Sequence, residues 1–200
     1  MTERGLEIAV ANSSPEATLT PLQRIRMAQD FFRFAHHVGT PISFGRRVEV
    51  PPPGLLIWGR HSLSPDEIEL DKETFAFCGT ILERLAYRLL AMELDAALIL
   101  AFRGEDRFNH MDAFIRNAST VIRLIRNAVA HNVLDPVWKI DRNLRNKQIT
   151  IEGLLTFDTR DLHGKPLKRL DFGGPIALFR LSERIVAELE RIKAPVVAEA

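Results

Sequence analysis

Two long segments of helical periodicity constrain the fold more than any other feature of this 200-residue chain. The first, over residues 73–102, carries apolar side chains on well over half of its circumference, as the central helix of a bundle does. The second, over residues 108–130, repeats apolar residues every three or four positions. Because only a turn at residues 103–106 separates the two helices, we expect them to pack antiparallel. The apolar stripe of the second helix contains Ile115, Ala118, Ile122, Ile125 and Val129.

Weaker signals before these helices predict one more helix and a loop. Thr20 suits an N-cap and Pro21 suits the first helical position, so a helix should begin there and end near His37. Residues 39–72 include three successive prolines, which predict a long loop with at most a short strand. Within it, Trp58 is either an anchor for a partner or a side chain that packs back on its own core.

After Trp138 the periodicity changes from 3.6 residues to 2. "KQITIEGLLTF" and "LHGKPLKRL" predict two strands around a turn at Gly164, and "GGPIALFRLSERIVAELERI" predicts a final helix. The expected fold class is therefore mainly α, an antiparallel helical bundle over residues 20–200. The hairpin and final helix form an extension over residues 139–194, and residues 1–19 form a mobile tail.

Charge is concentrated in one part of the chain. The composition, 46% hydrophobic and 26% charged with a net charge of +1, is that of an ordinary folded protein. Residues 107–147, however, hold eight Lys or Arg against three Asp. Arginine suits paired contacts with phosphate and equally suits surface salt bridges. Arg116, Arg123 and Lys139 are the candidate contacts with RNA phosphates.

Several function classes lack support in the sequence. Cys78 is the sole cysteine, and its apolar setting predicts a buried, inert thiol in a reducing compartment. We expect neither a signal peptide nor a membrane span, because the longest apolar stretch is interrupted by Glu93 and Asp95. The histidines have no cysteine or carboxylate at ligand spacing, so we expect no metal site and no cofactor. A cytoplasmic location follows.

Arg126 breaks the apolar pattern of the second helix. It lies about 40° from Ile122, at the edge of the stripe, where a guanidinium must be paired, reach solvent or serve a purpose. His131 follows five residues later, and Asn127 lies one turn before His131 on the same face. Asn127 can therefore hold the imidazole in one tautomer.

This combination suits RNA cleavage without a metal ion. A histidine can accept the proton of the ribose 2′-hydroxyl as that oxygen attacks the adjacent phosphorus. A guanidinium can stabilise the charge that develops on the phosphorane. A purely structural alternative also exists, in which His131 interacts with the helix C-terminus and Arg126 pairs with Asp112 or Asp135.

The segment "IRNAVAHN", with Arg126, Asn127 and His131 at the end of the second long helix, resembles the motif of HEPN domains (higher eukaryotes and prokaryotes nucleotide-binding). The resemblance covers roughly residues 73–140. It implies a small helical domain, usually dimeric, whose active members are metal-independent endoribonucleases with the Arg and His of both chains in one cleft. Many members serve as toxins or defence effectors, which implies an antitoxin protein as a partner. Val133 stands where some toxins carry a tyrosine used in their neutralisation.

The leading hypothesis is therefore a homodimeric, metal-independent ribonuclease that acts on RNA, with Arg126 and His131 catalytic and Asn127 orienting. The alternative is a catalytically inactive helical interaction or nucleotide-binding module that uses the same groove. A DNA-binding regulator is less well supported, because no helix-turn-helix spacing is present. Convergence of Arg126 and His131 in an exposed cleft would favour the enzyme, and pairing of Arg126 with a carboxylate would favour the module.

Overall fold

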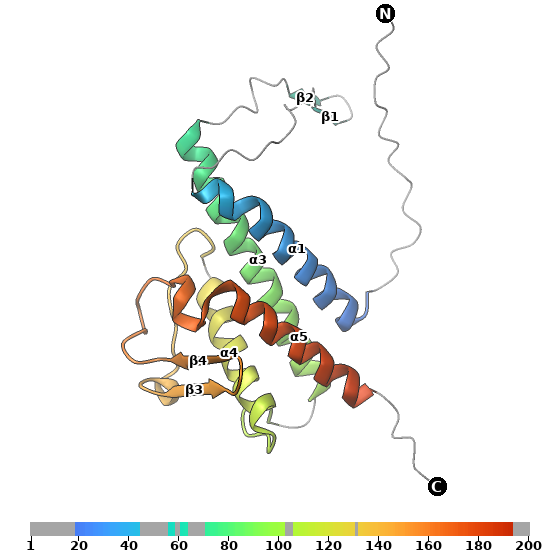
Figure 1. Cartoon of the computed structure of the whole chain (residues 1–200), viewed down its shortest axis with the longest axis vertical. Coiled ribbons are helices and arrows are strands. Elements are labelled where there is room, and N and C mark those ends of the chain that lie inside the picture. The colour runs from blue at the N-terminus through green and yellow to red at the C-terminus, as the bar shows by residue number, and fades with distance from the viewer. Residues whose placement is uncertain are drawn as a thin grey trace, which may run out of the picture.

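The computed structural model describes residues 19–44, 56–58, 61–63, 71–102, 106–130 and 132–193 (Figure 1). For residues 56–58 and 61–63 it describes the backbone only. The described chain is mainly helical, as predicted. Its helices are α1 (Pro21–Ser43), α3 (Lys72–Ala101), α4 (Ala113–Ala130) and α5 (Gly174–Lys193), with the short 3₁₀ helices η1 (Arg142–Leu144) and η2 (Arg169–Phe172). The strands are β1 (Leu56–Trp58), β2 (His61–Leu63), β3 (Gln148–Ile151) and β4 (Leu155–Asp158), paired as two antiparallel hairpins.

Helix α1 begins as predicted but ends later. Thr20 and Gln23 form a capping box, in which each side chain accepts a bond from the other residue's backbone N–H. The predicted end near His37 was wrong, because α1 continues through Gly39 and Pro41 to Ser43. Packing against α3 supports this extra turn, since the Thr40 hydroxyl donates a 2.6 Å hydrogen bond to Glu83.

Helices α1 and α3 approach each other at two glycines. A Cβ atom on Gly39 would lie 2.7 Å from the backbone oxygen of Gly79, and a Cβ atom on Gly79 would lie 2.7 Å from Cγ2 of Ile42. Both distances are too short for a real side chain, so the crossing depends on the absence of one. The two helices consequently lie side by side over much of their length (Figure 1).

Helices α3 and α4 pack antiparallel, as predicted (Figure 1). The bounds predicted for α3 were correct to within one residue, but α4 begins at Ala113 rather than near Phe108. The delay has a local cause, because the backbone N–H of Phe108 donates to Asp106 and that of Phe114 donates to Asp112. These bonds hold a non-helical turn before α4. The predicted apolar stripe of α4 is buried throughout.

The C-terminal hairpin differs from its prediction. Strands β3 and β4 both lie inside "KQITIEGLLTF", with Gly153 in their turn at φ 72°. No strand of the described chain covers the "LHGKPLKRL" segment, where Gly164 lies in a turn and Pro166 makes a single bridge with Val137. The earlier turn prevails because Ile149, Ile151, Leu155 and Phe157 alternate with exposed residues and bury one face of the hairpin.

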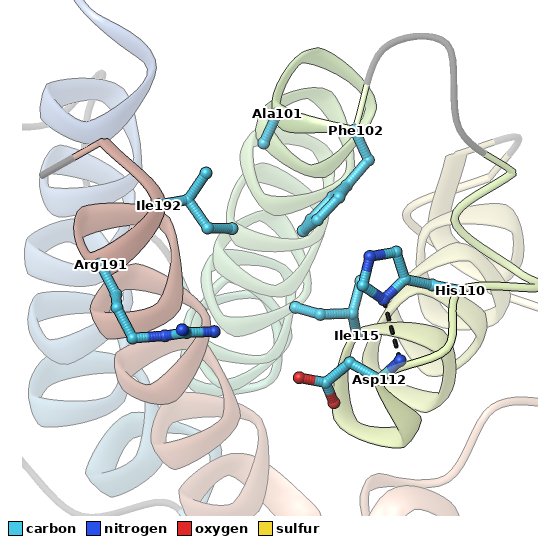
Figure 2. A pocket seen from close by; sticks show the side chains of 7 residues that line it. All are labelled: Ala101, Phe102, His110, Asp112, Ile115, Arg191 and Ile192. Carbon is cyan, nitrogen blue, oxygen red and sulfur yellow. Dashed lines mark hydrogen bonds between the residues drawn. The ribbon is translucent and has the colours of Figure 1, made fainter. Parts of the chain in front are cut away.

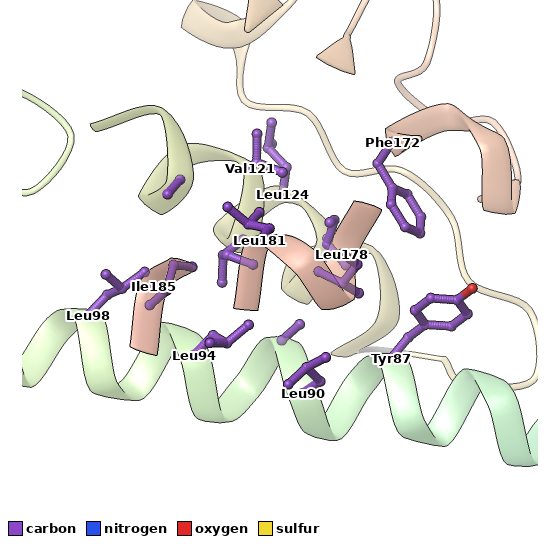
Figure 3. Close-up of a cluster of buried hydrophobic side chains, with 14 of the residues drawn as sticks. Tyr87, Leu90, Leu94, Leu98, Val121, Leu124, Phe172, Leu178, Leu181 and Ile185 are labelled. Atoms are coloured by element: carbon purple, nitrogen blue, oxygen red, sulfur yellow. The ribbon is translucent and has the colours of Figure 1, made fainter. Parts of the chain in front are cut away.

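The centre of the hydrophobic core lies between α3, α4 and α5 (Figure 3), and buried side chains of α1 belong to the same cluster. Burial of each large side chain in it contributes roughly 1.5–3 kcal/mol. Trp138 and Phe157, with ring centroids 5.1 Å apart, extend the core under the β3–β4 hairpin. Side chains that meet in the centre include Leu90, Leu94, Leu98, Val121, Leu124, Leu178, Leu181 and Ile185.

Some predictions concern residues that the structure does not describe. Residues 1–18 of the tail predicted over residues 1–19, and most of the loop predicted over residues 39–72, lie outside the described residues, as does the side chain of Trp58. The prediction for Cys78 was wrong, because its side chain is exposed. Its helix turn is apolar in sequence, but the neighbouring helices do not cover that side of α3. None of the described helices is both long enough and apolar enough to cross a membrane.

Candidate functional site

The two motif residues that the structure describes lie side by side at the end of α4. Arg126 Nη1 donates a 3.1 Å hydrogen bond to the side-chain oxygen of Asn127. The side chain of Arg126 is 46% exposed, because its position falls at the edge of the buried stripe. His131, the third motif residue, lies outside the described residues. The structure therefore brings Arg126 and Asn127 together and leaves the position of His131 as a prediction.

A buried carboxylate on α3 lies next to Arg126. Asp95 is 8% exposed, and its Oδ2 lies 3.8 Å from Nε of Arg126. Arg107 holds the same aspartate more closely, through 2.7 Å and 3.0 Å hydrogen bonds to Oδ1 and to the backbone oxygen. Arg126 thus pairs with Asp95, and not with Asp112 or Asp135 as the structural alternative assumed. The contact is long for an ion pair, so Arg126 keeps donors that face solvent.

Arg123, one turn before Asn127 on α4, forms a second cationic contact. Its Nη2 lies 3.2 Å from Oδ2 of Asp141, and its guanidinium carbon lies 4.9 Å from the ring centre of Phe108. Arg107 lies 4.7 Å from the same ring. These cation–π contacts hold both arginines in defined positions beside the motif.

A groove of about 630 Å³ runs beside this end of α4. Asn127 is the one described residue of α4 that lines it, and the rest of the lining comes from the segment before the β3–β4 hairpin and from the turn at Gly164. The polar side chains that line it include Lys139, Arg142, Arg145 and His163. Of the predicted phosphate contacts, Lys139 lines the groove and Arg123 adjoins it through Asp141.

Backbone hydrogen bonds fix the two walls of the groove. Trp138 donates its backbone N–H to Lys165 and accepts from Gly164, both at 2.9 Å. The Ile140 N–H donates a 3.1 Å bond to Nδ1 of His163, so the neutral ring carries its proton on Nε2. Below them, the Trp138 indole donates a 2.7 Å bond to Asp171.

Arg116, the remaining predicted phosphate contact, lies apart from this site. It is about 15 Å from Arg126 along the axis of α4. Its guanidinium donates a 2.7 Å bond to the backbone oxygen of His110. On α3, Arg84 does reach the segment after the motif, where it donates to the backbone oxygen of Leu134.

A second hollow of about 370 Å³ lies at the opposite end of α4 (Figure 2). Asp112 and Arg191 point toward one another across it. Each has a local partner, because Asp112 accepts from the Phe114 N–H and Arg191 pairs with Glu188 at 2.8 Å. Its polar groups thus serve helix capping and surface pairing.

Metal ligation finds no support in the described part of the chain, which contains no group of three His, Cys, Asp or Glu side chains placed to hold a metal ion. Comparison with family models, curated proteins and solved structures found no match to this chain. The functional argument therefore depends on the geometry of the groove and of the end of α4.

Proposed function

We propose that this protein is a metal-independent endoribonuclease of the HEPN type. Arg126 and His131 are its catalytic residues, and Asn127 orients the imidazole. One observation carries the proposal: Arg126 lies half exposed beside Asn127, and Asn127 lines a basic groove. An RNA strand bound in that groove would have a phosphodiester close to the Arg126 guanidinium.

The proposed reaction needs no group beyond the protein and the RNA. His131 accepts the proton of a 2′-hydroxyl while that oxygen forms a bond to the adjacent phosphorus. The bond from phosphorus to the 5′-oxygen breaks, and the proton that His131 accepted passes to this oxygen. Arg126 donates to the phosphorane oxygens, where negative charge accumulates. The products are a 2′,3′-cyclic phosphate and a 5′-hydroxyl.

The proposal includes a homodimer in which both chains contribute to one cleft. Support comes from α3, where Leu85, Leu89, Met92 and Ile99 are all exposed and follow one another at intervals of 4, 3 and 7 residues. Asp95 lies about 60° around α3 from Met92 and contacts Arg126. A second copy packed on this stripe would bring the two motif ends toward each other. A role as toxin or defence effector, with an antitoxin as partner, rests on the resemblance alone.

The ion pair between Arg126 and Asp95 favours a second candidate, a catalytically inactive helical module that binds a partner or a nucleotide. In this candidate the carboxylate satisfies Arg126 and the groove serves for binding only. The long 3.8 Å contact and the exposure of Arg126 are the reasons to rank the enzyme first.

Incubation of purified protein with RNA in EDTA tests the choice between the two. Wild-type protein and the His37→Ala variant, which removes an exposed histidine on α1, should cleave RNA. The His131→Ala variant should not. If the wild-type protein leaves every RNA intact, the binding module becomes the better account. If His131→Ala cleaves as fast as the wild type, the proposed catalytic pair is wrong.

A further inference from the structure

Three cations that line the groove have no carboxylate partner among the residues that the structure describes. Lys139, Arg142 and Arg145 are exposed, and within the described ranges none of them forms an ion pair. Asp141, the one carboxylate among the described lining residues, is paired with Arg123. Arginines elsewhere on the surface are often neutralised, as Arg33 is by Asp30. The groove therefore concentrates uncompensated positive charge.

The backbone under these cations is fixed before any ligand binds. Arg142 belongs to η1, whose last residue, Leu144, accepts a 2.6 Å hydrogen bond from the buried Thr159 hydroxyl. The same hydroxyl accepts a 2.9 Å bond from the Lys147 N–H. Arg145 Nε donates to the Ile140 oxygen at 3.2 Å, which leaves its two terminal nitrogens for another acceptor. A ligand would lose little energy in ordering such a platform.

We propose that Lys139, Arg142 and Arg145 form a subsite for consecutive backbone phosphates of single-stranded RNA. The choice of RNA among polyanions rests on the proposed function, because Asn127 of the motif lines the same groove. Guanidinium and ammonium groups bind phosphate oxygens through charge-assisted hydrogen bonds. The strand enters along residues 139–145 and reaches the end of α4 with its scissile phosphate.

The shape and lining of the groove select a single strand and give little sequence preference. A hollow of about 630 Å³ accepts a nucleotide with its flanking phosphates, but not a duplex. Two aromatic side chains lie among the described lining residues: Trp138, which is fully buried with its indole N–H bound to Asp171, and His163, which is exposed. A base can therefore stack on His163 but not on Trp138, and because any base can make such a contact, recognition rests mainly on the backbone.

Binding of a fluorescent, fully 2′-O-methylated RNA tests the subsite, because this RNA has no free 2′-hydroxyl and cannot be cleaved. Fluorescence anisotropy is measured between about 50 and 200 mM salt, the range over which phosphate contacts strongly affect affinity. The groove variant carries Lys139→Gln, Arg142→Gln and Arg145→Gln. A control variant with Arg26→Gln, Arg33→Gln and Arg180→Gln removes the same charge from α1 and α5. A third variant, Arg142→Lys with Arg145→Lys, keeps the charge of the groove.

The groove variant should bind at least about tenfold more weakly, and its slope of log K against log salt should be smaller by roughly 2, at about 0.7 for each lost contact on a single strand. The control variant and the Lys variant should keep the wild-type slope. An unchanged slope in the groove variant, or an equal loss in the control variant, would overturn the proposal. If polyglutamate displaces the RNA when both are present at the same concentration of negative charges, the proposal is overturned in favour of an acidic protein partner.

Parallel cleavage of unmodified RNA separates this inference from the proposed function. If the wild type cleaves RNA, and the groove variant binds and cleaves RNA as the wild type does, the subsite is refuted but the proposed ribonuclease activity is not. Salt-dependent binding through the groove without any cleavage would support the subsite and refute the ribonuclease. Thermal melts followed by circular dichroism verify that each variant is folded.

Discussion

Arg126 Nε lies 3.8 Å from Oδ2 of Asp95. The other carboxylate oxygen, Oδ1, accepts a 2.7 Å bond from Arg107, so one buried anion faces two cations. Arg107 is buried and Arg126 is half exposed. Asp95 and Arg107 neutralise each other. The charge of Arg126 is therefore only partly compensated by Asp95. A phosphate oxygen can supply the second anion.

Replacement of Asp95 tests how much its buried ion pair with Arg107 contributes to the free energy of unfolding. The Asp95→Asn variant keeps the shape of the side chain but leaves Arg107 buried without an anion, so unfolding should cost about 3 kcal/mol less. Urea denaturation measures the change. The Asp30→Asn variant, which breaks the exposed pair with Arg33, should denature as the wild type does. Equal stability of Asp95→Asn and wild type would show that the buried pair contributes nothing.

Gly39→Ala tests the close approach of α1 and α3. At an exposed helical position this change would stabilise the protein, by up to about 1 kcal/mol. Here the new Cβ would lie 2.7 Å from the backbone oxygen of Gly79, so we expect a loss of roughly 2 kcal/mol instead. Thermal denaturation provides the measurement, with His37→Ala on the exposed side of the same helix as the control. A variant as stable as the wild type would mean that the helices can separate at no cost.

The main helices were predictable because a period of 3.6 residues, sustained over long segments, leaves few alternatives. Their ends were less predictable. Helix α1 continues to Ser43 because Gly39 packs against Gly79, a contact between residues 40 positions apart. Helix α4 starts late because Asp112 accepts a backbone bond. The end of α1 thus depends on a tertiary contact, and a local sequence pattern cannot predict such a contact.

The candidate site was predicted only in part. Arg126, Asn127 and Lys139 were recognised from the motif and from the local charge. Asp95 was noted only as an interruption of an apolar run, and its contact with Arg126 requires α3 and α4 to pack as they do. Arg142 and Arg145 were part of the basic segment, but nothing in the sequence indicated that the turn at Gly164 would face them across a groove.

Tyr87 offers a direct test of burial, because it is the sole tyrosine of the chain. Burial raises its pKa well above the ordinary value of about 10, and the nearby Glu83 carboxylate raises the pKa further, although Arg169 opposes the shift. A raised pKa means that the neutral phenol stabilises the fold fully below about pH 10, and that this stability declines as the pH rises beyond it.

Ultraviolet titration of tyrosinate measures this pKa. The native protein should show no ionisation near pH 10, whereas the same protein unfolded in urea should be about half ionised there. A shared midpoint for the two states would contradict the burial of Tyr87 between His36 and Phe172.

The exposure of Cys78 predicts rapid chemical modification. Because the thiol is at the surface of α3, a thiol reagent should label the native protein completely and at a rate comparable to that of the protein in urea. Mass spectrometry of the product gives both the extent and the site. Protection of the native thiol would show that another surface, such as a second copy of the chain, covers this end of α3.

Single-turnover cleavage of an end-labelled RNA in EDTA, by the wild type and by Arg126→Ala, tests the central claim most directly. Arg180→Ala, which removes an exposed arginine of α5, is the control. Loss of a group that stabilises the phosphorane should slow Arg126→Ala by about 100-fold or more, with Arg180→Ala unchanged. A 2′-deoxy substitution before the scissile phosphate should abolish cleavage. Cleavage by Arg126→Ala at the wild-type rate would contradict the assignment of the site.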